Sequence, residues 1–152
     1  MGRRRNGGEE VIVIDTSAVV AIWKKEPLAE AVRARLTDEP ESERRISAAT
    51  YIEAGTVLAG GMPNDPFGVM AMFDAWLAEF SIALVPLDGE QAQVALGARI
   101  RRGRGFKTAA KLNMGDCFSY ALAKTLRAPL LYIGDDFDKT DIRPALRRRK
   151  SK

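Results

Sequence analysis

Short aliphatic runs alternate along the chain with longer segments whose apolar residues recur at helical spacing. Strands are expected at 11–14, 45–47, 82–87 and 130–133, with a polar loop, "PESERR", leading into the second. The first run is aliphatic without alternation, which is typical of a parallel strand buried on both faces. Helices are expected at 17–25, 28–38, 49–59, 66–80, within 88–103 and at 114–127. This alternation predicts an α/β domain with a parallel sheet.

The composition indicates one globular domain. Of 152 residues, 46% are hydrophobic, enough for a sizeable core. We expect a folded domain at 11–146, between a disordered basic lead at 1–10 and a basic tail at 147–152. No apolar run approaches the roughly 20 residues of a membrane span, and the first aliphatic run is too short for a signal peptide. The single cysteine, Cys117, excludes an internal disulfide and predicts a cytoplasmic protein, with this thiol in the core.

The chain contains no histidine. This excludes histidine-based triads, histidine general bases and ordinary zinc sites. Any metal ion must therefore be a hard cation that is bound by oxygen atoms.

The net charge is +4, and basic residues crowd both ends of the chain and the segment 99–111, which contains no acid. One interpretation of this segment is a solvated surface. The other is a surface that binds a polyanion. In that case the expected contacts with the polyanion are Arg101, Arg102, Arg104 and Lys107.

Several acids occupy positions that are unusual for surface charges. Asp15 ends the first strand, where it either caps the next helix or contributes to a site at the carboxyl edge of the sheet. Glu53 is the only charged residue between positions 46 and 64. Because an unpaired buried carboxylate is costly, Glu53 either reaches solvent or a local arginine, or faces a cavity and holds a cation.

Two further positions carry the same ambiguity. With Asn113 as N-cap, Asp116 is the third residue of a helix, where it completes a capping box or points out of the helix start into a site. Asp135 and Asp136 come just after the last predicted strand, separated from it only by Gly134, much as Asp15 follows the first strand. We choose Asp135 as the fourth acid of the set, with Asp136 as the alternative.

Parallel-strand topology brings such positions to one edge of the sheet. Carboxylates gathered there repel one another unless a divalent cation neutralises them. Mg²⁺ or Mn²⁺ suits all-oxygen ligation and keeps waters that serve as nucleophiles. The substrate expected for this arrangement is a phosphodiester.

The segments "VIVIDTSAVVAIW", "ISAATYIEAGTVL", "LNMGDCFSYALAK" and "LLYIGDDFDKTDI" resemble, in this order, the motifs of PIN-domain ribonucleases. They are most similar to the VapC toxins of type II toxin–antitoxin pairs, over 11–142. The resemblance implies a three-layer α/β/α domain, a homodimer, RNA cleavage and inhibition by a cognate VapB antitoxin. It implies that Asp15, Glu53, Asp116 and Asp135 are the catalytic, metal-binding acids. Thr16, Ser17, Asn113 and Asp136 match positions that orient such ligands.

Two alternatives remain at this stage. A haloacid-dehalogenase-like phosphatase also places an aspartate after its first strand, but needs a second acid two residues later, where this chain has Ser17. A non-catalytic RNA-binding module is the other alternative, although all four acids are in place. Hydrolysis of a small phosphomonoester would indicate the phosphatase, and RNA cleavage the nuclease.

Overall fold

A four-stranded parallel sheet forms the centre of the computed structural model, which describes residues 10–38 and 42–146. The strands are β1 (Val11–Ile14), β2 (Glu43–Ser47), β3 (Ile82–Val85) and β4 (Leu130–Leu131), in the spatial order β3-β2-β1-β4. Val11 pairs with Glu43 of β2, and Val13 pairs with Leu130 of β4. β1 is therefore a central strand, and its carboxyl end lies between those of β2 and β4.

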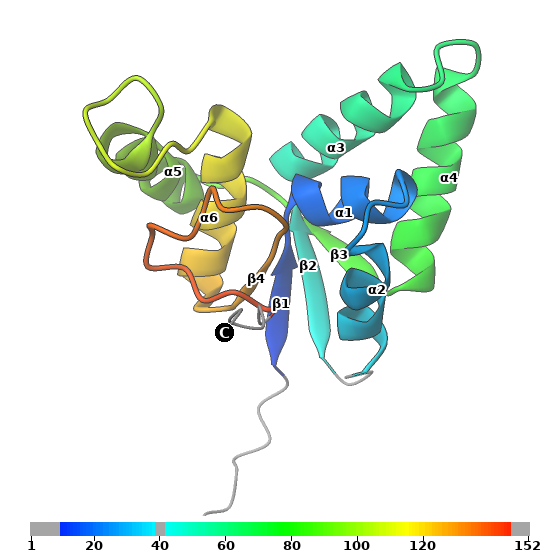
Figure 1. Ribbon diagram of the computed structural model, residues 1–152, viewed down its shortest axis with the longest axis horizontal. Coiled ribbons are helices and arrows are strands. Elements are labelled where there is room, and N and C mark those ends of the chain that lie inside the picture. The colour runs from blue at the N-terminus through cyan, green and yellow to red at the C-terminus, as the bar shows by residue number, and fades with distance from the viewer. Residues whose placement is uncertain (1–9, 39–41, 147–152) are drawn as a thin grey trace, which may run out of the picture.

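Helices cover both faces of this sheet (Figure 1). One face carries α1 (Thr16–Trp23), α2 (Ala29–Thr37), α3 (Ala48–Gly60) and α4 (Pro66–Glu79), and the other carries α5 (Gly89–Arg102) and α6 (Met114–Leu126). The three-layer α/β/α architecture expected from the sequence is thus confirmed, with a sheet that is parallel throughout.

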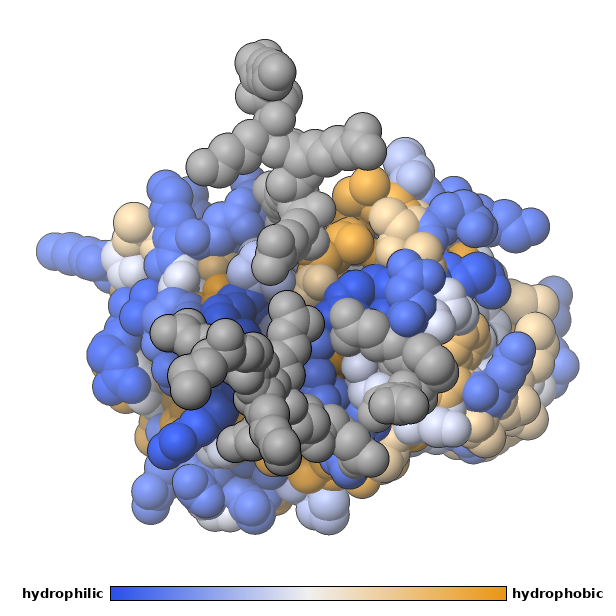
Figure 2. All heavy atoms as spheres, turned by 90° about the horizontal axis from the view of Figure 1, so that it is seen from below, coloured by the Kyte–Doolittle hydropathy of each residue, from blue (hydrophilic) through white to orange (hydrophobic). Residues whose placement is uncertain are grey.

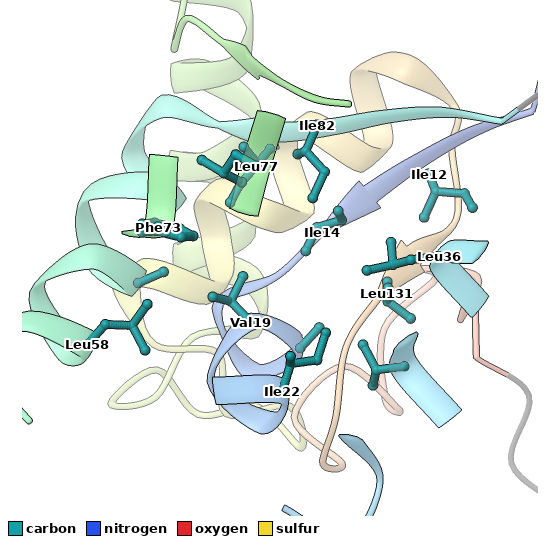
Figure 3. Close-up of a cluster of buried hydrophobic side chains, with 14 of the residues drawn as sticks. Ile12, Ile14, Val19, Ile22, Leu36, Leu58, Phe73, Leu77, Ile82 and Leu131 are labelled. Atoms are coloured by element: carbon teal, nitrogen blue, oxygen red, sulfur yellow. The ribbon is translucent and has the colours of Figure 1, made fainter. Parts of the chain in front are cut away.

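Each face of the sheet has its own core. Ile14 of β1, Val19 of α1 and Phe73 of α4 meet in the cluster on the first face (Figure 3). On the opposite face, Val13 packs with residues of α5 and α6, among them Leu122. The continuous aliphatic sequence of β1 is explained by these two cores, because successive side chains of a strand enter opposite layers. Cys117 is buried in the second core, as expected.

Strand β2 begins two residues earlier than the sequence indicates. The prediction of a polar loop up to Arg45 is wrong, because Glu43 and Arg44 already pair with β1. Arg44 is buried, and its guanidinium donates to the carbonyls of Phe80, at 3.0 Å, and Leu36. Arg45 instead pairs with Glu43 on the half-exposed side, at 2.5 Å. Because the buried position 44 is an arginine that binds backbone carbonyls, the alternation of apolar and polar residues typical of a strand is not visible in this part of the sequence.

Strand β4 is shorter than expected. It ends at Leu131, whereas the sequence predicts a strand up to Ile133. The backbone N–H of Ile133 donates to the side-chain oxygen of Ser17 at 3.0 Å instead of to a neighbouring strand. This contact leads the chain away from the sheet, toward the segment that carries Asp135 and Asp136.

The chain ends lie at or beyond the limits of the structure. The predicted lead at 1–10, apart from Glu10, and the predicted tail at 147–152 fall outside the described residues. Within the described part, no helix has the length and apolar character needed to cross a membrane. Seen from below, at the amino ends of the strands, hydrophilic side chains are interspersed with apolar ones (Figure 2). At the opposite edge of the sheet, Asp15 follows the carboxyl end of β1, and Asp135 and Asp136 follow that of β4.

Candidate active site

Asp15 is buried at the carboxyl end of β1, with 2% of its surface exposed. One carboxylate oxygen accepts a hydrogen bond from Ser119 Oγ at 2.6 Å. The other accepts from Ser17 Oγ at 2.7 Å and from the Ser17 backbone N–H at 3.1 Å. Asp15 is also the N-cap of α1. Burial raises the pKa of this carboxyl above its ordinary value, and the hydrogen bonds from Ser119 and Ser17 act in the opposite direction.

A chain of hydroxyl groups extends from Asp15 into the neighbouring helices. Ser119 of α6, which donates to Asp15, lies 3.1 Å from Thr50 Oγ1 of α3. Both residues are fully buried. Neither residue was predicted from the sequence, because their contacts join segments that are far apart along the chain. A signal was present at Ser119, which lies three residues after Asp116 and therefore on the same side of the helix.

Asp116 forms a capping box with Asn113 at the start of α6. Its carboxylate accepts from the Asn113 backbone N–H at 3.0 Å, while its own N–H donates to Asn113 Oδ1 at 2.8 Å. Asp116 is also buried, with 7% of its surface exposed, and the negative charges of nearby acids raise its pKa. The capping and site interpretations of this residue are therefore compatible.

Glu53 approaches the same helix start from α3. Its half-buried carboxylate lies against Gly115, so closely that a β-carbon added at Gly115 would collide with both of its oxygens. A side chain at position 115 would occupy the space that the Glu53 carboxylate fills, which explains the glycine there. This close approach places Glu53 beside Asp116 and not out in solvent.

Between Asp135 and Asp136, the electrostatics at Asp116 favour Asp136 as the fourth acid of the set. The pKa of Asp116 is raised to about 7, mainly by burial and also by the charges of Asp15, Asp136 and Glu53, while the hydrogen bond from the Asn113 N–H acts in the opposite direction. Asp136 is thus the member of the exposed Asp135–Asp136 pair whose charge acts on Asp116. Both residues line a cavity of about 210 Å³ together with Lys111 and Lys139. The two lysines place positive charge beside this pair.

These acids have the chemistry of a site for a hard divalent cation. They offer only oxygen donors, and their mutual repulsion is the kind that a bound cation relieves. Thr16 Oγ1, next to Asp15, is buried and has no hydrogen-bond partner among the described residues. As the side chains stand, the described residues contain no group of three that encloses a single ion. A single ion would therefore be held by these acids only after side chains rotate.

The basic segment lies beside this site. Exposed Arg104 and Lys107 line an open cavity of about 570 Å³, whereas exposed Arg101 does not. Arg102 is already engaged, because its guanidinium donates to the Lys139 carbonyl at 3.2 Å and lies 3.7 Å from Asp141. Arg104 and Lys107 are thus the better placed of the four predicted RNA contacts.

Comparison with known proteins gives the family of this chain. Residues 12–143 match the family model of the PIN domain. Ribonuclease VapC of Mycolicibacterium smegmatis is 44% identical over 131 residues, which cover 86% of this chain and 97% of that protein. Ribonuclease VapC42 of Mycobacterium tuberculosis is 40% identical over 134 residues, which cover 88% and 98%.

Solved structures share the fold. The crystal structure of M. tuberculosis VapC20, described as a sarcin–ricin loop cleaving toxin, has a TM-score of 0.67 at 14% identity and covers 88% of this chain and 99% of that one. VapBC2 from Rickettsia felis, bound to a DNA fragment from their promoter, has a TM-score of 0.63 at 12% identity and covers 88% and 96%. From the family model and the relatives, the chain belongs to the PIN domain family and, within it, to the VapC ribonucleases.

The raised pKa of Asp116 predicts a specific dependence of stability on pH. A carboxyl with a raised folded-state pKa contributes stability that is fully present below about pH 4 and is lost as the pH rises through about 7. Asp116→Asn removes this loss and keeps an oxygen that accepts the Asn113 N–H. In EDTA, the variant should match wild type near pH 3.5 and be more stable at pH 8, by about 1–3 kcal/mol. Urea unfolding at the two pH values measures this difference.

Asp88→Asn is the matched control, because Asp88 is an exposed N-cap whose side chain accepts from the Gln91 N–H. It should change stability little at either pH, since Asn caps helices about as well as Asp. If Asp116→Asn is less stable than wild type at pH 8, the capping interaction outweighs repulsion and the proposed acid cluster is refuted.

The contact of Glu53 with Gly115 predicts a loss of activity without a loss of fold. In Gly115→Ala the new methyl group must displace the Glu53 carboxylate, which is the flexible end of its side chain. We expect unfolding free energy to stay within about 1 kcal/mol of wild type and catalytic rate to fall by roughly 10- to 100-fold. Mn²⁺ affinity, measured by calorimetry, should fall as well. Gly60→Ala at the end of the same α3, where a β-carbon meets nothing within 4 Å, is the control. Equal losses in both variants would contradict this role of Glu53.

Proposed function

We propose that this protein is a Mg²⁺- or Mn²⁺-dependent endoribonuclease and the toxin of a type II toxin–antitoxin pair. The observation that carries the proposal is the set of carboxylates around buried Asp15, in a chain without histidine. Relatives that are 40–44% identical over nearly their whole length are named ribonucleases, which supports RNA as the substrate.

Asp15, Glu53, Asp116 and Asp136 are the proposed ligands of the metal ion. When bound, the ion supplies Lewis acidity toward the scissile phosphate and an attacking water. We choose Asp136 over Asp135 because its charge acts on Asp116. The remaining residues position these acids.

Ser17 and Ser119 hold the two oxygens of Asp15 in a fixed orientation, which is the role expected for the neighbours of a metal ligand. Asn113 fixes the backbone that presents Asp116. Lys111 and Lys139, at the cavity beside Asp136, provide positive charge for RNA phosphates.

The phosphatase alternative loses its support. Position 17, where that mechanism needs an acid, is a serine whose hydroxyl donates to Asp15. The match of residues 12–143 to the PIN domain also accounts for the strand-end acids without it. A non-catalytic RNA-binding module remains the outcome if no cleavage is found.

The proposed partner is a VapB-type antitoxin. Structural neighbours include VapBC2 from R. felis and a toxin–antitoxin complex from Klebsiella pneumoniae, which supports such a pairing. The chain also exposes large apolar side chains on α3 and α4, namely Ile52, Val57, Phe67, Met70 and Met72. Such surfaces mark protein interfaces, here with an antitoxin and with a second copy in a homodimer. We place the protein in the cytoplasm, where RNA and a free cysteine are both expected.

Purified protein should cleave RNA in Mg²⁺ or Mn²⁺ and stop cleaving when EDTA is added. Asp15→Asn should abolish cleavage, because the remaining acids lose the ligand that is held most rigidly. Denaturing gels of total RNA, with end mapping of the fragments, measure this activity. Cleavage that persists in EDTA, or that Asp15→Asn preparations share, would contradict the proposed chemistry.

Expression of the wild-type chain alone should arrest bacterial growth, and coexpression of its cognate VapB-type antitoxin should restore growth. Asp15→Asn is the control for toxicity by overexpression and should be tolerated at the same protein level. Normal growth despite abundant, folded wild-type protein that cleaves RNA in vitro would refute the toxin assignment.

A further inference from the structure

A single aromatic residue stands in the basic segment beside the acids. The open cavity of about 570 Å³ is lined by residues 103–108, 110 and 111, with Phe106 among them. Phe106 is 45% exposed and belongs to neither core cluster. An exposed phenylalanine on a charged loop contributes nothing to the core, and the cavity volume is in the range of sites for small ligands, about 300–1,000 Å³.

Arg99 contacts the Phe106 ring and supports it in its position. Its guanidinium lies 5.4 Å from the ring centroid, within cation–π range. The same guanidinium donates to the Arg104 carbonyl at 2.6 Å, which ties the loop back to α5. Phe106 is therefore supported by α5 while nearly half of its surface is free.

The cavity leads toward the acidic site. Ala110 and Lys111 line both this cavity and the smaller one that contains Asp135, Asp136 and Lys139. Asp136 in turn acts on Asp116. The two cavities thus form a continuous surface that begins at an aromatic ring among cations and ends at the carboxylates.

We propose that Phe106 is a stacking platform for one unpaired base of the RNA substrate, next to the phosphate that is cleaved. Arg104, Lys107 and Lys111 bind the backbone on either side of that base. This inference rests on the proposed function and specifies its substrate as RNA with an unpaired nucleotide at the cleavage site. A base in a continuous duplex is excluded, because both of its faces are covered by its neighbours.

Binding is measured by fluorescence anisotropy with labelled RNA, in Mg²⁺ and in the Asp116→Asn background, so that the RNA stays intact. The probes are a single-stranded 12-nucleotide RNA of mixed sequence and a blunt duplex of the same sequence. Phe106→Ala should weaken single-strand binding by about 5- to 150-fold, the range found when a stacking aromatic is removed. Phe106→Trp should retain affinity, and Phe106→Leu, which is apolar but cannot stack, should not.

Two controls separate stacking from charge and from general loss of surface. Leu126→Ala removes another exposed apolar side chain, 40% exposed at the end of α6 that is remote from Asp116, and should leave affinity unchanged. Lys107→Ala should flatten the slope of log affinity against log salt by about 0.7 for the one lost phosphate contact, whereas Phe106→Ala should leave that slope unchanged. The tryptophan of Phe106→Trp should be quenched by the single strand and not by the duplex.

Unchanged affinity in Phe106→Ala, full rescue by leucine, or equal quenching by duplex would overturn the platform. If wild type cleaves RNA while any of these results is found, the proposed function stands and this inference fails. If the unsubstituted protein neither binds nor cleaves RNA, both fail together.

Discussion

The buried carboxylate of Asp15 is the interaction on which the rest of the site depends. It lies at the end of a central strand, and its hydrogen-bond donors come from helices on both faces of the sheet: Ser17 of α1 on one side and Ser119 of α6 on the other. Through Thr50 the network also reaches α3. A buried carboxylate without partners would cost several kcal/mol, so these donors must stay in place for the fold to tolerate it. The same contacts therefore align three helices and orient one proposed ligand.

At Asp116, the gathering of acids that the proposed function needs lowers the stability of the metal-free fold. Asp116 is held by its capping box, yet burial and the charges of Asp15, Asp136 and Glu53 raise its pKa to about 7. Acids collected in this way weaken the metal-free fold at neutral pH. A cation relieves that repulsion and stabilises the native state in proportion to its affinity. If the proposed ion binds these acids, function and full stability depend on the same ion.

Much of the fold and part of the site could be predicted from the sequence because they rest on local signals. The Asn113–Asp116 capping box and the transition from β1 to α1 at Asp15 each involve residues that are only a few positions apart in the sequence. The contacts of Ser119 and Thr50 could not be predicted in this way, because they join segments that are 69 and 104 residues apart.

Two further features depend on what only the fold supplies. Buried Arg44 resembles a loop residue in a polar run, because only the fold supplies the carbonyls that its guanidinium needs. The choice between Asp135 and Asp136 depends on backbone angles in the turn after β4, which begins at Gly134 with a φ of 96°. Both acids are exposed, and composition does not reveal that Asp136 is the one whose charge acts on Asp116.

The most direct test of this account is a crystal structure of the protein grown in Mn²⁺, with anomalous diffraction at the manganese edge. The account predicts an anomalous peak bound by oxygens of Asp15 and Asp116, with Glu53 and Asp136 contributing directly or through water, and with Asp135 outside the site. Ser17 and Ser119 should still contact Asp15. An ion bound elsewhere, or no ion at these acids in saturating Mn²⁺, would contradict the central claim that the buried carboxylates form a metal site.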